Sequence, residues 1–304
     1  MRIGSVASDA PSTRCNSIGA FERGPRARNV MCKRHGSWSF LCLALALAGC
    51  AKAPHSTPPI DTRYRAQSQD SRVQYLILHY TDAPLEPALR ILTQQGVSAH
   101  YLVSDKDPPV IYRLVDEDRR AWHAGQSSWQ GATMLNSASI GIEIVNPGPR
   151  VAPDGTVGFA PYPPAQVDVV VRLVRDIVAR HGIRPDRVLG HNEVAPQRKI
   201  DPGPAFPWRV LAEAGLIAWP EPSRVAAQRP RFECALPEAL WFQKTLAAIG
   251  YAVPDSGAFD TPTRRVIAAF QMKYRPSRYD GEPDAETAAL MHVLAEPLGK
   301  ADGR

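Results

Sequence analysis

A proline-rich stretch beyond the middle of the chain brings three kinds of reactive side chain together. The stretch is GHNEVAPQRKIDPGPAFPW, residues 190–208, and it contains His191, Lys199 and Asp201. Proline interrupts both helices and sheets, and positions 196, 202, 204 and 207 are all proline. We therefore expect a loop that carries an imidazole, an amine and a carboxylate, a combination suited to metal binding or acid–base catalysis.

Histidines elsewhere in the chain can complete a metal site with this loop. Four of the eight histidines lie near predicted strands or loops of one domain: His79, His100, His123 and His191. A catalytic zinc ion takes three protein ligands, typically imidazole nitrogens and carboxylate oxygens, together with a water. Such a site would draw on His79, His191 and Asp201, but residue types and spacing alone leave His100 and His123 as alternatives to His79.

A carboxyl in a predicted strand and the loop lysine can supply the remaining chemistry of a hydrolase. In the strand-like run SIGIEIV, residues 139–145, the isoleucines share one face, and Glu143 shares the other face with Gly141 and Val145. A carboxyl among small or apolar neighbours is suited to moving a proton. The amine of Lys199 is suited to stabilising a negatively charged oxygen.

These residues are positioned by a predicted α/β domain over residues 73–218. Short apolar runs of strand length occur at 73–80, 100–105, 110–115 and 139–145. Helical spacing of apolar residues occurs at 84–96 and, more clearly, from Pro164 to Gly182, where glycine is expected to end the helix. Strands that alternate with helices indicate an α/β fold.

A second, helical domain is expected over residues 235–296, after a linker at 219–234 that has several prolines and no periodicity. Three helical patterns follow, and Phe-Gln and Asp-x-x-Thr each occur twice, the latter at Asp260 and Asp284 as expected of helix N-caps. Paired acids, Cys/His clusters and glycine-rich phosphate loops do not occur in this domain, so we expect no catalysis there. It serves either in binding or only in supporting the first domain.

The N-terminus, residues 1–49, has the pattern of a leader with a bacterial signal peptide. Lys33 and Arg34 precede an apolar run at 38–48 that is too short to span a membrane. The run ends in Leu-Ala-Gly-Cys, which resembles the lipobox in which Cys50 becomes acylated. Met31 is an alternative translation start, and the polar residues 50–72 are expected to form a tether from the lipid.

Cysteine usage and charge give two further expectations. Of five cysteines, only Cys234 lies beyond Cys50, so no internal disulfide can form, and Cys234 is expected to be partly buried. The net charge of +6 is concentrated in residues 1–49, which carry seven basic and two acidic residues. Because the remaining 29 basic and 28 acidic residues nearly balance, we expect no nucleic-acid partner.

Five motifs, in order, resemble those of the type 2 N-acetylmuramoyl-L-alanine amidases: LILHYT (76–81), SAHYLV (98–103), AWHAG (121–125), SIGIEIVN (139–146) and residues 190–208. These are zinc amidases that share their fold with the peptidoglycan recognition proteins. The resemblance implies a mixed central sheet flanked by helices. It also implies the following site: zinc ligands His79, His191 and Asp201, catalytic Glu143 and Lys199, and His100, Trp122 and His123 around the site or substrate groove.

The helical domain resembles the bacterial peptidoglycan-binding domain through its Asp-x-x-Thr and Phe-Gln motifs. Together the resemblances imply hydrolysis of the amide between the lactyl group of N-acetylmuramic acid and L-alanine, in peptidoglycan or muropeptides. They also imply an outer-membrane lipoprotein that faces the periplasm. Two alternatives are a recognition protein without catalysis and a zinc peptidase that cuts stem peptides.

Overall fold

The computed structural model describes residues 58–296. The chain divides after Arg65 into two units, of which the first is described only at residues 58–65. There Arg63 donates from Nε to Asp61 Oδ2 over 2.9 Å. The expected leader, Cys50 and the first part of the tether lie outside the described residues. Within the described residues, no helix combines the length and apolarity needed to cross a membrane.

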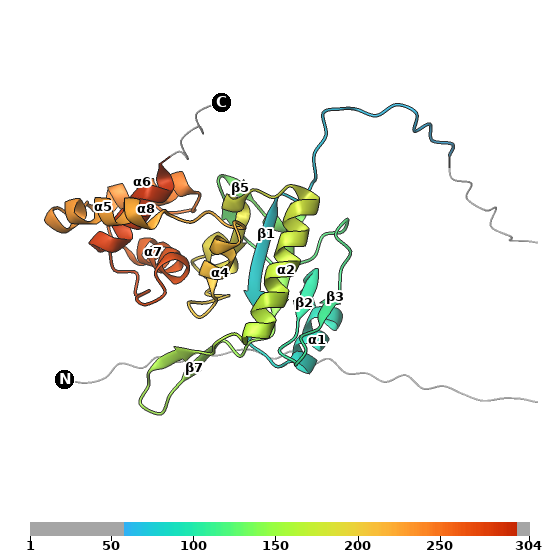
Figure 1. Ribbon diagram of the computed structural model, residues 1–304, viewed down its shortest axis with the longest axis horizontal. Coiled ribbons are helices and arrows are strands. Elements are labelled where there is room, and N and C mark those ends of the chain that lie inside the picture. The colour runs from blue at the N-terminus through green and yellow to red at the C-terminus, as the bar shows by residue number, and fades with distance from the viewer. Residues whose placement is uncertain (1–57, 297–304) are drawn as a thin grey trace, which may run out of the picture. The chain divides into compact units, whose positions relative to one another are not determined.

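A five-stranded mixed sheet forms the centre of the second unit, which starts at Ala66 (Figure 1). Its order is β3 (Ile111–Arg113), β2 (Tyr101–Val103), β6 (Ser139–Ile144), β1 (Tyr75–Tyr80) and β9 (Val188–Gly190). Only the pair formed by β2 and β3 is antiparallel; the other neighbours are parallel. The mixed sheet expected from the sequence is therefore confirmed.

Helices cover the sheet on both faces. α2 (Pro164–His181) buries Val170, Val174 and Ile177 against the isoleucines of β6. Proline at its first position and Gly182 at its end, with φ of 67°, give this helix the boundaries that the sequence predicts. α1 (Leu85–Gln94) packs on a separate cluster with Leu102 and Val145. The isoleucines of β6 thus enter one core, whereas Val145, which directly follows the strand, enters the other.

Shorter elements surround the sheet. They are β4 (Ser128–Trp129), β5 (Ala132–Thr133), the 3-10 helices Leu135–Ser137 and Pro185–Arg187, the hairpin β7 (Pro149–Val151) and β8 (Val157–Phe159), α3 (His191–Val194) and α4 (Trp208–Glu213). The expectation that residues 190–208 form a loop throughout is wrong, because α3 begins at His191. The side chain of Glu193 accepts a hydrogen bond from the backbone nitrogen of Gly190 over 2.7 Å. This capping contact stabilises one helical turn before the first proline, Pro196.

The helical region contains the three predicted helices, namely α6 (Ala239–Ile249), α7 (Thr261–Tyr274) and α8 (Ala285–Ala295). A further helix, α5 (Pro222–Cys234), corrects the expectation of an irregular linker at 219–234. Glu221 caps α5 by accepting from the backbone nitrogens of Ser223 and Arg224, and Phe232 is buried against Trp241. Cys234 is exposed rather than partly buried, because it ends this helix.

The internal repeat has a structural explanation. Asp260 Oδ1 accepts from the backbone nitrogen of Thr263 over 2.9 Å, and Asp284 does the same for Thr287 over 2.8 Å. Both aspartates are therefore N-caps, as predicted. Each repeated glutamine then donates to the threonine of one motif, Gln243 to Thr263 and Gln271 to Thr287, over 2.8 and 3.1 Å. The repeat thus joins one helix to the start of the next.

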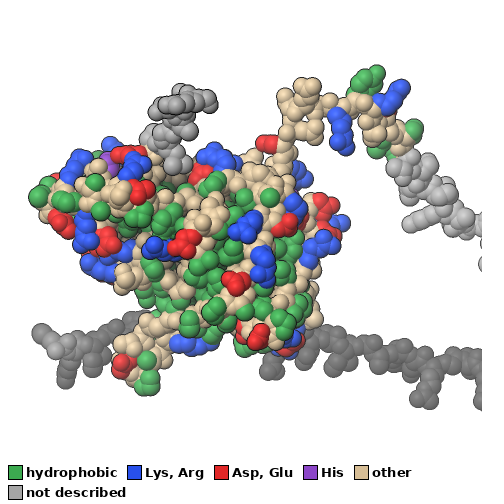
Figure 2. Space-filling model, in the orientation of Figure 1, with side chains coloured by type: hydrophobic (Ala, Val, Ile, Leu, Met, Phe, Trp, Pro, Cys, Tyr) green, Lys and Arg blue, Asp and Glu red, His purple; other side chains and the backbone are tan. Residues whose placement is uncertain are grey.

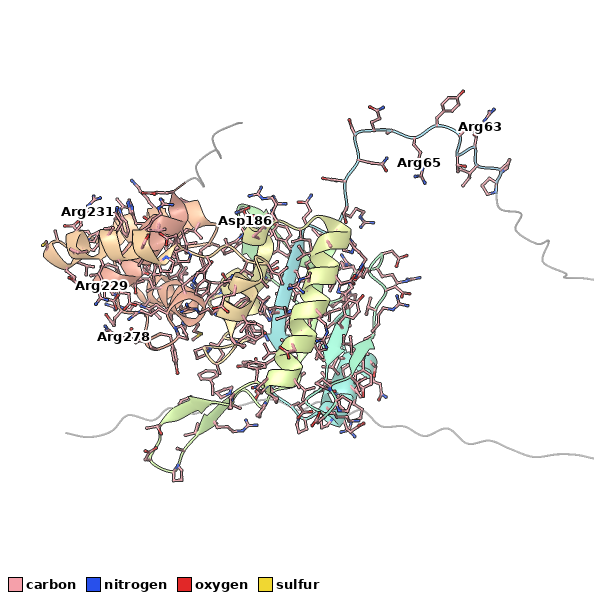
Figure 3. The ribbon with its side chains drawn as sticks, in the orientation of Figure 1. Arg63, Arg65, Asp186, Arg229, Arg231 and Arg278 are labelled. Carbon is pink, nitrogen blue, oxygen red and sulfur yellow. The ribbon has the colours of Figure 1, made fainter. Side chains whose placement is uncertain are left out.

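Charged side chains of both signs are mixed on the face shown in Figure 2, including the part formed by the helical region. Arg229 and Arg231 of α5 and Arg278 after α7 extend from this region into solvent (Figure 3). Two of the three form ion pairs, Arg229 with Glu233 and Arg278 with Asp280. Positive charge on this face is therefore partly compensated by neighbouring acids.

Candidate metal centre

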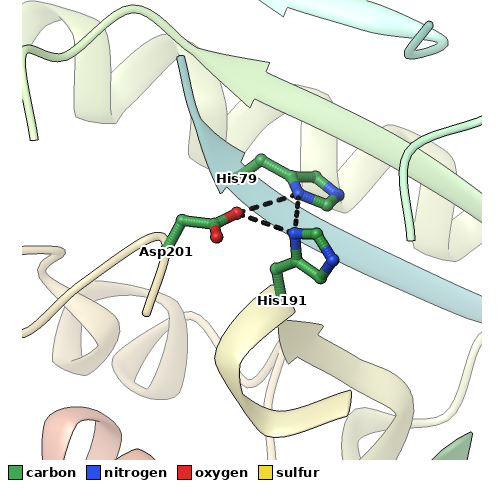
Figure 4. A group of neighbouring side chains, drawn as sticks. All are labelled: His79, His191 and Asp201. Carbon is green, nitrogen blue, oxygen red and sulfur yellow. Dashed lines mark hydrogen bonds and ion pairs between the residues drawn. The ribbon is translucent and has the colours of Figure 1, made fainter. Parts of the chain in front are cut away.

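Three side chains from distant parts of the chain converge at one edge of the sheet (Figure 4). His79 Nδ1 lies 2.9 Å from His191 Nδ1, and each of these nitrogens lies 3.0 Å from Asp201 Oδ2. The three residues are at most 6% exposed. The structure therefore brings together the three residues for which the sequence predicts metal binding.

The parallel pairing of β1 and β9 explains how His79 and His191 meet. Leu78 pairs with Gly190 in the register, so the next residue of each chain segment is a site histidine. Carboxyl ends of parallel strands meet at the same edge of a sheet. Asp201 returns to this edge because its carbonyl accepts a hydrogen bond from the backbone nitrogen of Asn192 over 2.9 Å.

A chain of hydrogen bonds determines which nitrogen of His79 carries its proton. Ser139 donates from Oγ to the Leu135 carbonyl over 2.7 Å, so it accepts from His123 Nε2 over 3.2 Å. His123 Nδ1 then has a free lone pair and accepts from His79 Nε2 over 3.0 Å. Because neutral imidazole has one N–H, His79 Nδ1 presents a lone pair to the centre.

His191 has the same tautomer for a simpler reason. Its Nε2 lies 3.2 Å from the carbonyl oxygen of Ala124 and donates to it. Its Nδ1 therefore also presents a lone pair, directed at Asp201 and His79. Metal-binding histidines typically donate from their other ring nitrogen to an acceptor of this kind.

The convergent donors suit a tetrahedral metal ion. Two imidazole lone pairs and one carboxylate oxygen form a nearly equilateral triangle with sides of 2.9 to 3.0 Å. Ligands about 2.1 Å from a tetrahedral zinc ion lie about 3.4 Å from one another. A small outward movement of the side chains would admit the ion. A cation at this position would compensate the three electron-rich atoms, which otherwise face one another. The residues present therefore fit zinc.

Burial and charge keep the two kinds of ligand in their metal-binding forms. Burial and the neighbouring His191 lower the pKa of His79 to about 4, against the opposing effect of Asp201. Burial alone would raise the pKa of Asp201, but His191 and His79 outweigh it and lower that pKa below its usual range. At neutral pH the site therefore holds an uncharged His79 and an ionised Asp201.

Glu143 lies next to this triangle in the sheet. It pairs in register with His79, and side chains of register partners on neighbouring strands lie on the same face. Its Oε2 is enclosed and has no hydrogen-bond partner among the described residues. Burial and the charge of Asp201 raise its pKa well above the ordinary value, although Lys199 opposes them. Glu143 is thus a carboxyl that holds a proton more readily than an ordinary glutamate.

A cavity of about 400 Å³ opens over these groups. Its lining includes the metal-site triangle, Glu143 and the other predicted residues Trp122, His123 and Lys199, together with Arg198. Trp122 is 55% exposed. The cavity therefore joins a buried set of reactive groups to a solvent-facing aromatic side chain, as expected of a site that binds a substrate at its surface.

His100 is placed differently from the other predicted residues. It is fully buried and does not line the cavity. Its Nδ1 accepts from the backbone nitrogen of Gly141 over 3.0 Å, and its Nε2 donates to the carbonyl of Arg119 over 3.2 Å. Both ring nitrogens are thus used within the protein, so His100 holds β6 and the 119–123 segment together.

Two contributors to the site were missed by reasoning from the sequence. Ser139 completes the hydrogen-bond chain to His79, and Arg198 donates to the carbonyl of Gln126 over 2.7 Å beside His191. Gly141 in the SIGIEIV run is a sequence feature that could have indicated the hydrogen-bond chain from Ser139 to His79. A side chain at position 141 would collide with the ring of His123.

We expect Gly141→Ala to weaken metal binding. An alanine Cβ would lie 2.4 Å from Cγ of His123, so the ring must move and the hydrogen bond to His79 is lost. Loss of such support raises the metal dissociation constant about 10-fold or more. Competition with a chelator measures this constant. Gly158→Ala in β8 is the control, since no atom lies within 4 Å of its added Cβ; equal constants for both variants would contradict the prediction.

Comparison with known proteins places this site in a family. The family model described as N-acetylmuramoyl-L-alanine amidase matches residues 69–204, and a model for a peptidoglycan binding domain matches residues 236–291. The chain is 44% identical to the N-acetylmuramoyl-L-alanine amidase AmiD of Escherichia coli over 273 residues, which are 84% of this chain and 96% of AmiD. The chain belongs to the N-acetylmuramoyl-L-alanine amidase family.

Solved structures of family members agree with this fold. A complex of AmiD from E. coli with anhydro-N-acetylmuramic acid-L-Ala-D-γ-Glu-L-Lys matches with a TM-score of 0.72 and 42% identity, over 79% of this chain and 95% of that one. AmpDh3 from Pseudomonas aeruginosa matches with a TM-score of 0.73 and 37% identity, over 79% and 98%. Both matches cover nearly all of the other chain, so the α/β fold of this amidase and its helical region are shared with solved relatives.

Proposed function

We propose that this amidase uses zinc to hydrolyse the amide between the lactyl group of N-acetylmuramic acid and L-alanine in peptidoglycan or its fragments. The observation that carries the proposal is the buried triangle of His79, His191 and Asp201, with Glu143 beside it on the wall of an open cavity. AmiD, whose substrate in its complex is a muramyl peptide, supports the choice of bond.

His79, His191 and Asp201 would hold the zinc ion through Nδ1, Nδ1 and Oδ2. When bound, zinc supplies positive charge that polarises a carbonyl and makes water more acidic. The protein contributes the orientation of both imidazoles, through Ser139 and His123 for one ring and the Ala124 carbonyl for the other.

Glu143 is the proposed proton carrier. Its enclosed Oε2 has no partner in the described part of the chain, so it is free to bond to water or substrate in the cavity. Its pKa is raised above that of an ordinary glutamate, so a proton that it takes up is retained for transfer to the leaving group. Glu143 thus takes a proton from the attacking water and delivers it to the leaving amine of L-alanine.

Lys199 is the proposed stabiliser of the negatively charged oxygen that forms when the amide carbonyl is attacked. It lines the same cavity and precedes Asp201 by two residues. Its backbone nitrogen donates to the carbonyl of Ala195, which holds this segment in place. An ammonium group placed where charge develops lowers the barrier more than it favours the uncharged substrate. Trp122 and His123, which also line the cavity, are proposed to contact the substrate.

We expect Lys199→Ala to keep zinc and lose turnover. Lys199 is not one of the three converging donors, so metal content stays at one equivalent. Loss of a charged oxyanion partner lowers kcat about 10² to 10³-fold. Metal analysis and kinetics on a purified muropeptide measure both quantities, with Lys244→Ala, an exposed site on α6, as the control. A Lys199→Ala enzyme of near-full rate would show that its proposed role is wrong.

Mass spectrometry of digested peptidoglycan tests the bond assignment. We expect free stem peptides that begin with L-alanine, together with glycan that keeps its lactyl groups. Shortened peptides still attached to sugar would identify a zinc peptidase instead. Absence of any product, with zinc bound, would identify a recognition protein without catalysis.

We further propose that the mature protein is a lipoprotein of the bacterial outer membrane that faces the periplasm, with its lipid on Cys50. The Leu-Ala-Gly-Cys sequence at residues 47–50 and the basic, apolar leader support this location. The match to a peptidoglycan binding domain at residues 236–291 agrees with a site of action in the cell envelope. Cell fractionation tests the anchor. We expect the wild type to sediment with membranes and the Cys50→Ala variant to stay in the soluble fraction.

A further inference from the structure

A buried ion pair joins the helical region to the segment that carries His191. Lys273 Nζ of α7 lies 2.9 Å from Glu193 Oε2 of α3, and their side chains are 3% and 0% exposed. Tyr251, which follows α6, donates to the other oxygen, Oε1, over 3.0 Å and is itself 3% exposed. Two residues of the helical region therefore bond to the two carboxylate oxygens of one glutamate in the amidase region.

Glu193 connects these contacts to the metal site. The same Oε2 that accepts from Lys273 also accepts from the backbone nitrogen of Gly190 over 2.7 Å. Gly190 and Glu193 are on either side of His191, which is the first residue of α3. The side chain of Glu193 therefore closes the turn from which the imidazole of His191 extends.

Further contacts hold the backbone on both sides of this turn. Lys273 also donates to the carbonyl of Val188 in β9 over 3.1 Å, and its ammonium lies 4.4 Å from the ring centre of Trp208. Asn192 donates to the carbonyl of Ala269 over 3.4 Å. Every residue from Val188 to Val194 is buried. The turn is thus enclosed between the central sheet and α7. The ammonium group of Lys273 on α7 bonds to the sheet at Val188 and to the turn at Glu193.

The cost of burying charge makes this arrangement sensitive to loss of one partner. A buried carboxylate that loses its cation is destabilised strongly, because its charge is then left uncompensated in the protein interior. Glu193 would then rotate or draw in water, and either change alters its hydrogen bond to Gly190. The orientation of His191 depends on that turn, and metal affinity depends on the orientation of the ligands.

We propose that Lys273 and Tyr251 are positioning residues for the metal ligand His191, so that the helical region completes the metal site of the amidase region. The inference rests on the proposed function, since it takes the His79, His191 and Asp201 triangle to be the zinc site. It gives the helical region a role in metal binding, in addition to any role in binding peptidoglycan.

Zinc affinity of the full chain tests the proposal. We expect Lys273→Met, which keeps the length of the side chain and removes its charge, to raise the zinc dissociation constant about 10-fold, as loss of second-shell support does. A chelator competition measures the constant. The visible spectrum of the cobalt-substituted protein should also change in band position or intensity, because it reports ligand geometry.

Arg275→Met is the matched control. Arg275 directly follows the same helix as its C-cap and is also buried, with its side chain 7% exposed, but it pairs over 3.0 Å with Asp284 inside the helical region. We expect it to lower the unfolding midpoint while the zinc constant stays within about twofold of the wild type. Equal zinc constants for Lys273→Met and the wild type, with unchanged cobalt spectra, would overturn the proposal, as would equal weakening by Arg275→Met.

A milder variant serves if Lys273→Met does not fold. Tyr251→Phe removes one hydroxyl and keeps the buried ring, and we expect it to raise the zinc constant about threefold, the scale of one hydrogen bond. An unchanged constant in that variant would overturn the proposal. A wild type that binds no zinc would refute the zinc assignment and this inference together, whereas normal wild-type binding with unaffected variants would refute the inference alone.

Discussion

Asp201→Ala is expected to abolish zinc binding and amidase turnover together. Asp201 supplies the one anionic donor of the triangle, and its Oδ2 lies 3.0 Å from both imidazole nitrogens. Two neutral imidazoles do not compensate the charge of a buried divalent ion, so the ion is lost rather than bound more weakly. Turnover should fall by at least about 10³-fold, the scale seen when a member of a catalytic group is removed.

Metal content and kcat of the same preparations check this expectation. Asp176→Ala on α2, an exposed aspartate that pairs with Arg180, is the control and should match the wild type in both. Asp201→Ala protein that kept one equivalent of zinc would contradict the ligand assignment. Protein that lost zinc but kept its rate would contradict the proposed role of the metal.

Glu143→Gln is expected to separate metal binding from catalysis. Glutamine keeps the shape of glutamate but cannot accept and return a proton. Because Glu143 is outside the ligand triangle, zinc should remain at one equivalent while kcat falls about 10² to 10⁴-fold, the usual contribution of a general acid–base. Kinetics on a muropeptide and metal analysis measure the two effects. Loss of zinc equal to that of Asp201→Ala would show that Glu143 is a ligand instead.

The same variant gives a pH-dependent effect on stability. In the metal-free protein, burial and Asp201 raise the pKa of Glu143 well above its ordinary value of 4.5. A raised pKa in the folded state means that the folded protein holds a proton which the unfolded chain releases above pH 4.5. The wild type therefore loses stability as pH rises from there to the folded pKa.

Glu143→Gln does not titrate at this position, so its free energy of unfolding relative to that of the wild type should increase as pH rises above 4.5. The difference grows by up to about 1.4 kcal/mol per pH unit until the folded pKa is reached. Urea unfolding of the metal-free proteins measures it. A constant difference over this range would mean that Glu143 titrates normally in the fold.

Local pattern was sufficient to predict the elements that carry the site. The alternation in SIGIEIV predicts both the strand and the side of Glu143, and the apolar run before His79 predicts β1. The three ligands converge because β1 and β9 are parallel neighbours, a relation that residue spacing alone does not contain. The family resemblance supplied the choice of His79 over His100 and His123.

Tertiary contacts explain what the sequence did not reveal. α5 has few apolar residues, and its prolines suggest a linker, but Phe232 and the cap at Glu221 stabilise it against α8. The roles of His123 and Ser139 depend on a hydrogen-bond chain whose members are 16 and 44 residues apart. The pairing of Lys273 with Glu193 spans 80 residues and two regions. Such relations become visible only when the fold is known.

Zinc reconstitution of the metal-free amidase is the most direct test of the central claim. Stripped protein should have no measurable activity on a muramyl peptide, and zinc should restore activity in proportion until one equivalent is bound. The released product should then be the free peptide beginning with L-alanine. Full activity in rigorously metal-free protein, or a titration that ends at two equivalents, would contradict a single catalytic zinc ion held by His79, His191 and Asp201.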